Sequence, residues 1–212
     1  MKILAFTDIH GSAKHSGYIS AHDMIKSLDD FKKEIKREKI GLVVCTGDFT
    51  VFGDHMELFL KKIASLGAEV LLIHGNHEDE LDVKILSKRY PNVEFLHKKM
   101  KRIGDYVFVG YGGGGFSKKD PEFVHAMKKL SEKLSKNDKV ILLTHGPPYG
   151  TKLDFRPGYG HVGNIDYREF IDKHNVVIAL CGHIHEGFGK HQKIGHTLLI
   201  NPGPKGKIIE IK

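Results

Sequence analysis

The sequence predicts an α/β fold built around a largely parallel sheet. Short apolar runs, each of the length of a buried strand, end directly in polar loops. Between these runs, apolar residues recur every three or four positions, as they do on one face of a helix. Strands that alternate with helices form βαβ units, and these units build parallel sheets. A chain of 212 residues can bury one large core, so we expect a single domain over residues 1–212.

The first half of the chain contains three predicted strand–helix units. We expect strands at 2–6, 42–45 and 69–73. A polar loop over 7–17 should lead to a helix at 21–38, whose apolar stripe contains Met24, Leu28, Phe31 and Ile35. Asp54 and Glu57 predict a capping box for the next helix, and Gly67 predicts its end. The stripe of that helix contains Met56, Phe59, Leu60 and Ile63. A short third helix should end near Arg89.

The second half is more mixed. Strands are expected at 93–96, 106–109, 140–143 and 176–180. Asp120 and Pro121 predict the start of a helix, with an apolar face of Phe123, Val124, Met127, Leu130 and Leu134. Asn164 can cap a further helix that runs through Ile171. Residues 196–200 and 207–211 suggest a terminal hairpin joined by a turn at 201–204.

Composition limits the classes of function. The formal charge of +7 suits an anionic substrate and is compatible with nucleic acid, but the lysines are spread over predicted helix faces, as on a solvated surface. No apolar run approaches the ~20 residues that span a bilayer. The chain starts with a strand-like segment, without a secretion signal, so we expect a cytoplasmic protein. Cys45 and Cys181 end apolar runs, and we expect both to be buried, reduced thiols.

Metal-ligating side chains follow the predicted strands, just past their carboxyl ends. In open α/β sheets this edge is where binding sites form, so these side chains can converge. Each of them alone has an ordinary explanation as a turn, a cap or a loop histidine. Together they are more numerous than the ligands that one ion binds, so we predict two metals that share one aspartate. The ligand set is Asp8, His10, Asp48, Asn76, His145, His183 and His185.

Five short blocks resemble the signature of the calcineurin-like metallophosphoesterase family. They stand in order across nearly the whole chain: Asp8-Ile9-His10, Gly47-Asp48, Gly75-Asn76-His77-Glu78, His145 and Gly182-His183-Ile184-His185. The segments His145-Gly146-Pro147-Pro148 and Asn201-Pro202-Gly203 look most like those of small, uncapped members, including the brain-protein-239-like phosphodiesterases. This resemblance implies a four-layer αββα sandwich of two mixed sheets flanked by helices.

The resemblance also implies a role for each ligand. Asp8, His10 and His185 would hold the first metal, Asn76, His145 and His183 the second, and Asp48 would bridge them. A hydroxide between the two ions would attack phosphorus, and the ions would neutralise the phosphate oxygens. His77 would donate a proton to the leaving alkoxide or a hydrogen bond to the developing charge. Glu78 would orient His77 or brace its loop. His183 and His185 would reach neighbouring ions because residues two apart in a strand face the same side.

The metals and the substrate are less narrowly defined. Ligands of oxygen and nitrogen without thiolate suit Mn, Fe, Zn, Co or Ni, and we favour Mn. The predicted function is hydrolysis of a small phosphodiester, with nucleotides among the candidates. A phosphomonoesterase, a nuclease and a non-catalytic interaction scaffold are the alternatives. Whether the chain acts as a monomer or a homodimer stays open.

Two loops are candidates for substrate contact. The loop at 148–163 contains Arg156, which could clamp a phosphate, together with Tyr159 and His161. An ordinary surface loop explains it equally well. Residues 112–115 are consecutive glycines, which suit either a tight turn over the metals or a close approach to an anion.

Overall fold

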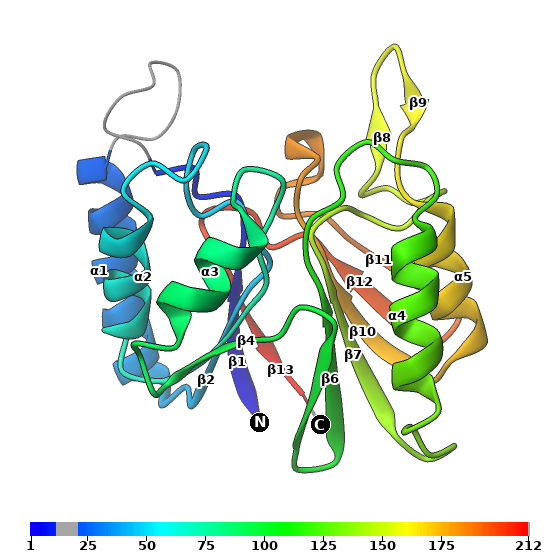
Figure 1. Ribbon diagram of the computed structural model, residues 1–212, viewed down its shortest axis with the longest axis horizontal. Helices are drawn as coiled ribbons and strands as arrows, with labels where there is room; N and C mark the ends of the chain where they lie inside the picture. The colour runs from blue at the N-terminus through cyan, green and yellow to red at the C-terminus, as the bar shows by residue number, and fades with distance from the viewer. Residues whose placement is uncertain (12–20, 212) are drawn as a thin grey trace.

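Two β-sheets lie face to face, and helices cover the outer face of each (Figure 1). We describe residues 1–11 and 21–211 of this computed structural model, and the side chains of its first helix from Lys26 onward. The part of the predicted polar loop beyond Gly11 and the side chain of Met24 lie outside the described residues. The layers run helices, sheet, sheet, helices, which confirms the αββα sandwich.

The first sheet has the strand order β13-β1-β2-β3-β4. Its strands pair in parallel, except that β13 runs antiparallel to β1. The helices α1, α2 and α3 lie against its outer face (Figure 1). The bounds are β1 (Lys2–Phe6), α1 (Ala21–Glu38), β2 (Leu42–Cys45), α2 (Met56–Ala64), β3 (Glu69–Leu72), α3 (Glu80–Ser87), β4 (Val93–Phe95) and β13 (Lys207–Glu210).

The second sheet has the order β11-β12-β10-β7-β6-β5, with antiparallel strands at both edges. The helices α4 and α5 cover it (Figure 1). A small hairpin and a 3₁₀ turn stand outside both sheets. The bounds are β5 (Lys99–Ile103), β6 (Tyr106–Tyr111), α4 (Pro121–Ser131), β7 (Lys139–Thr144), β8 (Phe155–Arg156), β9 (Gly160–His161), α5 (Ile165–Lys173), β10 (Val176–Leu180), η1 (His185–Gly187), β11 (His191–Ile194) and β12 (Thr197–Ile200).

Inner strands are buried on both faces because each sheet separates two apolar cores. In β1, Leu4 and Phe6 pack toward the helices, whereas Ile3 and Ala5 pack between the sheets. Side chains of a strand alternate between its faces, so a continuous apolar run fills both cores. Each large side chain buried in this way stabilises the fold by about 1.5–3 kcal/mol. The rigid strands then carry the polar loops at their carboxyl ends.

The predicted terminal hairpin is wrong. Strand β12 pairs with β10 and β11 in the second sheet, whereas β13 pairs with β1 in the first. The segment 201–204 therefore carries the chain from one sheet to the other. Asn201, which is fully buried, supports this crossing: its Oδ1 accepts from Gly203 N at 3.1 Å and its Nδ2 donates to Ile184 O at 3.2 Å. A Pro-Gly segment between two apolar runs suggests a hairpin, but it does not determine which strands will pair.

Other deviations concern helix ends, the edge strands β5 and β11, and the short hairpin of β8 and β9. Helix α2 begins at Met56, and its N-cap is His55 in a left-handed conformation, without the predicted capping box at Asp54. It ends at Ala64, before Gly67. Strand β5 was not predicted because its sequence, KMKRI, is charged, as is common at sheet edges. In α4, Val124 is half exposed, and Leu134 lies beyond the helix.

The predicted cap of α4 is present and has a second role. Asp120 Oδ1 accepts from Phe123 N at 2.9 Å and from the Tyr111 hydroxyl at 3.0 Å. Its Oδ2 lies 3.4 Å from the hydroxyl of Tyr167, so two buried tyrosines depend on this carboxylate. Asn164 caps α5 in the same way, accepting from Tyr167 N.

Replacing Asp120 with alanine is expected to lower the free energy of unfolding by about 2–4 kcal/mol. The lost cap accounts for about 1 kcal/mol, and the two buried hydroxyls left without an acceptor account for the remainder. Asp79→Ala is the matched control, because Asp79 caps α3 through exposed hydrogen bonds only, and should cost about 1 kcal/mol. Urea unfolding measures both. Equal losses would mean that the hydroxyls find other partners.

Among the helices in the described part of the chain, none combines the length and the apolar character needed to cross a membrane.

Candidate metal centre

The polar loops that follow β1, β2, β3, β7 and β10 meet at the carboxyl edge of the two sheets. In the first sheet, Asp8 N donates to Gly47 O at 3.0 Å, which joins the loops after β1 and β2. In the second, Gly182 N donates to His145 O at 2.7 Å. The ring of His145 connects the sheets, because its Nδ1 lies 2.9 Å from Thr46 O. The predicted ligands therefore come together across both sheets.

Several of these residues have an unusual backbone. Asp8, His10, Asp48 and His183 have φ values of 53°, 48°, 49° and 65°. This left-handed conformation costs a non-glycine residue on the order of 1–3 kcal/mol when the surroundings enforce it, and it is concentrated at functional sites. The predicted strand geometry of His183 and His185 is therefore wrong: β10 ends at Leu180, and His185 begins η1. The turn at His183 directs the two rings to different places.

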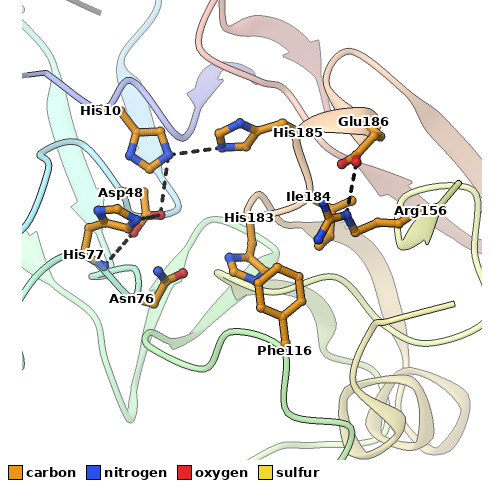
Figure 2. A pocket seen from close by; sticks show the side chains of 10 residues that line it. All are labelled: His10, Asp48, Asn76, His77, Phe116, Arg156, His183, Ile184, His185 and Glu186. Atoms are coloured by element: carbon orange, nitrogen blue, oxygen red, sulfur yellow. Dashed lines mark hydrogen bonds and ion pairs between the residues drawn. The ribbon is translucent and has the colours of Figure 1, made fainter. Parts of the chain in front are cut away.

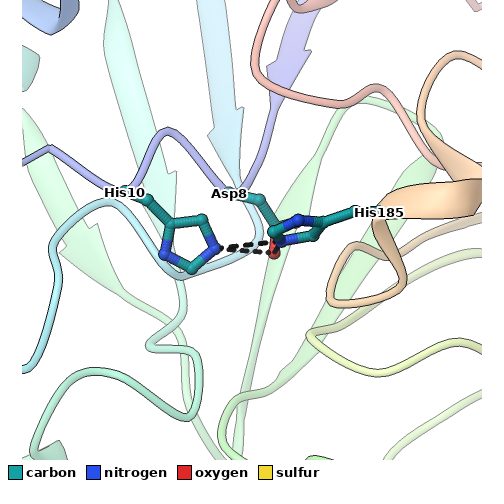
Figure 3. A group of neighbouring side chains, drawn as sticks. All are labelled: Asp8, His10 and His185. Atoms are coloured by element: carbon teal, nitrogen blue, oxygen red, sulfur yellow. Dashed lines mark hydrogen bonds and ion pairs between the residues drawn. The ribbon is translucent and has the colours of Figure 1, made fainter. Parts of the chain in front are cut away.

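Asp8, His10 and His185 form the first group of side chains (Figure 3). His10 Nε2 and His185 Nε2 lie 3.2 Å apart. Asp8 Oδ1 lies 3.6 Å from the first of these nitrogens and 3.7 Å from the second. Thr7 and the backbone of His183 hold the carboxylate, since both donate to it at 2.6–3.1 Å. Two imidazoles and a fixed carboxylate thus face one point.

Asp48, His145 and His183 form the second group, with Asn76 beside it. His145 Nε2 lies 3.2 Å from Asp48 Oδ2 and 3.0 Å from Asn76 Oδ1. Because the carbonyl of Thr46 can only accept, His145 Nδ1 carries a proton, and in the neutral ring Nε2 keeps its lone pair for a ligand. His183 Nε2 is buried without a hydrogen-bond partner among the described residues. Such a nitrogen fits a metal ion better than an apolar core.

The carboxylate of Asp48 belongs to the second group and also lies next to the first. Its Oδ2 is 3.2 Å from His145 Nε2 in one group and 3.6 Å from His10 Nε2 in the other. Its Oδ1 accepts from the backbone N–H of His77 at 3.0 Å. One side chain therefore touches both groups and also the loop after β3.

Glu78 braces the loops around Asp48. Its buried carboxylate accepts from Asp48 N, Gly75 N, Thr50 N and Thr50 Oγ1 at 2.8–2.9 Å. Burial, together with the neighbouring charge of Asp48, raises the pKa of Glu78 to about 7. Two roles were considered for Glu78, orienting His77 or bracing its loop. These hydrogen bonds support the second.

The electrostatics of the centre favour positive charge. Burial alone would raise the pKa of Asp8, but hydrogen bonds with His10 and His185 outweigh it and hold that pKa far below its usual range. Burial would likewise lower the pKa of His145, yet the charges of Asp48 and Asp8 raise it to about 10. Buried carboxylates that stabilise a cation this strongly suit a site for divalent ions.

His77 lies at one side of the cleft, near Asp48 and His10 (Figure 2). Its ring stacks on Phe52, with centroids 4.5 Å apart, and meets the ring of His10 edge-on at 4.8 Å. His77 Nε2 is 4.0 Å from Asp48 Oδ2. Burial lowers the pKa of His77, although the charge of Asp48 opposes the effect. The neutral ring therefore prevails near pH 7.

A cleft of about 590 Å³ opens over these groups. Arg156 lines it, and Arg156 Nε donates to Glu186 Oε1 at 3.0 Å (Figure 2). Tyr159 lies outside the lining, largely exposed, with its ring 5.3 Å from the guanidinium of Arg156. His161 points elsewhere: its Nδ1 is 2.8 Å from Asp154 Oδ1, and it lines a different hollow.

Sequence reasoning missed three residues that line the cleft: Phe116, Ile184 and Glu186. Two of them adjoin predicted ligands, and Phe116 follows the four glycines. The position directly after the four glycines was the available signal for Phe116.

A further group, His74, Glu80 and His97, also has ligand atoms within 4.8 Å of one another. Gly112 N donates to His97 Nδ1 at 2.8 Å, so the proton of the neutral ring lies on Nε2, which faces Glu80 Oε2 at 3.3 Å. A protonated nitrogen has no lone pair for a metal. We interpret this group as support that holds the glycine loop against the end of β3, where Gly113 N donates to His74 O.

The sequence profile of the family described as calcineurin-like phosphoesterase matches residues 1–187. No curated protein sequence matches the chain significantly. Solved structures are similar in fold. The protein TT1561 of Thermus thermophilus is 19% identical with a TM-score of 0.71, over 95% of this chain and 88% of that one.

Two further structures carry functional names. A dimetal phosphatase from Danio rerio is 12% identical with a TM-score of 0.62, over 94% of this chain and 86% of that one. A structure described as a novel archaeal phosphodiesterase is 17% identical with a TM-score of 0.53, over 96% and 84%. At these identities the likeness concerns the fold alone.

Proposed function

Because this chain belongs to the calcineurin-like phosphoesterase family, we propose that it hydrolyses a small phosphodiester with the help of two divalent metal ions. One observation carries the proposal: the buried carboxylate of Asp48 belongs to one group of metal-ligating side chains and also lies next to the other. The family uses a dinuclear divalent metal site and acts on small phosphate esters. The preference for diesters is supported by the resemblance to small, uncapped members.

We assign the ligands by these groups. Asp8, His10 and His185 would hold one ion; Asn76, His145 and His183 would hold the other; Asp48 would contact both. When bound, two such ions lower the pKa of a water molecule and neutralise phosphate oxygens. Oxygen and nitrogen ligands without thiolate suit Mn, which we favour, and also Fe, Zn, Co and Ni. The buried, unpaired thiols Cys45 and Cys181 are compatible with the reducing cytoplasm.

His77 is proposed to assist the leaving group. Its backbone N–H is bound to Asp48, so its loop is fixed relative to the shared carboxylate. The neutral ring, favoured by burial, still has one N–H, which can donate a hydrogen bond to the charge that develops on the departing oxygen. The stacked ring of Phe52 limits the orientations of the imidazole.

The reaction can be tested with the purified protein loaded with Mn²⁺. We expect bis(p-nitrophenyl) phosphate to be hydrolysed faster than p-nitrophenyl phosphate. The reverse order would identify a phosphomonoesterase. If protein that binds two ions hydrolyses neither ester with Mn, Fe, Zn, Co or Ni, the enzymatic proposal is wrong and the scaffold interpretation gains support.

His77→Ala should retain both metals and lose about 10²–10³-fold in kcat. The loss should be larger for a diester with a phenolate leaving group than for one with p-nitrophenolate, because more negative charge collects on the oxygen of the poorer leaving group, which therefore depends more on the hydrogen bond from His77. Metal content by elemental analysis and kcat on both esters measure this. His125→Ala, an exposed histidine of α4, is the control. Unchanged turnover in the His77 variant would remove its assigned role.

A further inference from the structure

The wall of the cleft opposite His77 differs in character from the metal centre. Figure 2 shows Phe116 and Arg156 on the side away from His77, with Glu186 and Ile184 next to them. We call Phe116, Arg156 and Glu186 the aromatic wall. The ring centroids of Phe116 and His183 lie 4.5 Å apart, so Phe116 is in direct contact with the second group. An ester group attached to a phosphate at the metals would therefore reach this wall.

Phe116 lies at the cleft although packing against the core does not fix its position. Its side chain is 59% exposed. The three residues before it, Gly113, Gly114 and Gly115, have φ values of 78°, 96° and 114°, which residues with side chains rarely adopt. The loop thus follows a path that requires glycine and ends by presenting an apolar ring to a polar site. Packing in the core does not explain this arrangement.

Arg156 lies over that ring. Its guanidinium carbon lies 5.4 Å from the centroid of Phe116 and 5.3 Å from that of Tyr159. Its Nε is bound to Glu186. Among the described residues, no hydrogen bond uses its two terminal amino groups, so they can donate to a ligand. A flat ring and a neighbouring fork of donors can bind a planar group that carries acceptor atoms.

The ion pair between Arg156 and Glu186 favours a neutral ligand over a second phosphate. Because the carboxylate of Glu186 neutralises Arg156 at 3.0 Å, the wall has no net charge to attract a second phosphate. The same carboxylate would repel a phosphate placed near it. A neutral, planar heterocycle faces neither obstacle, and stacking on an aromatic ring is favourable for any nucleobase.

We propose that the aromatic wall binds a nucleobase, so that the preferred substrates are phosphodiesters whose retained ester group is a nucleoside. This inference rests on the proposed phosphodiesterase function and on the role of His77. If His77 serves the leaving group, that group lies on its side of the cleft, and the group that stays on phosphorus extends to Phe116.

Two esters with the same leaving group separate this inference from the proposed function. Thymidine 5′-(p-nitrophenyl phosphate) and methyl p-nitrophenyl phosphate both release p-nitrophenolate and differ only in the retained group. In the Mn²⁺-loaded protein, kcat/KM should favour the thymidine ester by about tenfold, mainly through KM. In Phe116→Leu this ratio should approach one, and Phe116→Trp should restore it.

Phe155→Leu is the matched control, because Phe155 is a half-exposed phenylalanine of the neighbouring hairpin that lines a different hollow. Its ratio should equal that of the unmodified protein. Unfolding midpoints show whether the variants are folded. We expect both to fold, because the side chains of Phe116 and Phe155 are exposed. Hydrolysis of both esters with a ratio near one, unaffected by Phe116→Leu, would overturn the nucleobase subsite and leave the phosphodiesterase intact. Hydrolysis of neither ester would refute the proposed function, and the subsite with it.

Discussion

Replacing Asp48 with alanine is expected to abolish the binding of both metal ions and to reduce hydrolysis to the background rate. The carboxylate lies 3.6 Å from His10 Nε2 in one group and 3.2 Å from His145 Nε2 in the other. Without it, each group loses an anionic ligand, and the imidazoles that remain lose the charge that makes a dication favourable. Its Oδ1 also no longer fixes the backbone of His77.

His10→Ala provides the contrast for this prediction. His10 belongs to the first group and is not part of the second, so its removal should weaken one ion and leave the other bound. Elemental analysis after dialysis against Mn²⁺ should give no bound metal for the Asp48 variant and about one ion per chain for the His10 variant. Circular dichroism establishes that both are folded. Two ions retained in the Asp48 variant would show that the carboxylate does not serve both groups.

The sequence was sufficient to bring the predicted ligands together. Apolar runs identified the strands, and carboxyl ends of parallel strands share one edge. Residues as distant as Asp8 and His185, which nearly meet in the structure, could be expected at one edge for that reason, and the resemblance to the family assigned them to the same metal. The bounds of α1, β2 and β10 also follow from apolar periodicity and run length. Where the core determines the structure, the pattern in the sequence is enough.

The structure differs from the predictions where packing imposes no regular pattern of apolar residues on the sequence. β12 and β13 are both short and apolar, and no alternation distinguishes a strand of one sheet from a strand of the other. The left-handed turn at His183 depends on contacts with Asp8, which lies 175 residues away. Phe116 belongs to a loop without periodicity. The convergence of the predicted ligands was thus predictable from local sequence, but the shape of the cleft around them was not.

The loops after β2 and β3 touch with no space between them. Gly47 and Gly75 face each other: a Cβ added to Gly47 would lie 2.4 Å from Gly75 N. A Cβ on Gly75 would lie 1.9 Å from Asp48 Oδ1 and 2.6 Å from Asp48 N. The same Gly75 N–H donates to Glu78. The position of the shared carboxylate therefore depends on the absence of a side chain at residue 75.

Gly75→Ala should consequently disturb metal binding more than stability. The methyl group must displace Asp48, and overpacking of this kind typically costs about 1–3 kcal/mol, which a domain of this size can tolerate. Manganese affinity should fall as far as in the Asp48 variant, although no ligand has been removed. Gly41→Ala is the control, because a Cβ there meets nothing within 4 Å, and it should leave affinity and stability close to normal. Normal manganese affinity in Gly75→Ala would mean that the loops separate without moving the carboxylate, and that the close contact of the two glycines does not position Asp48.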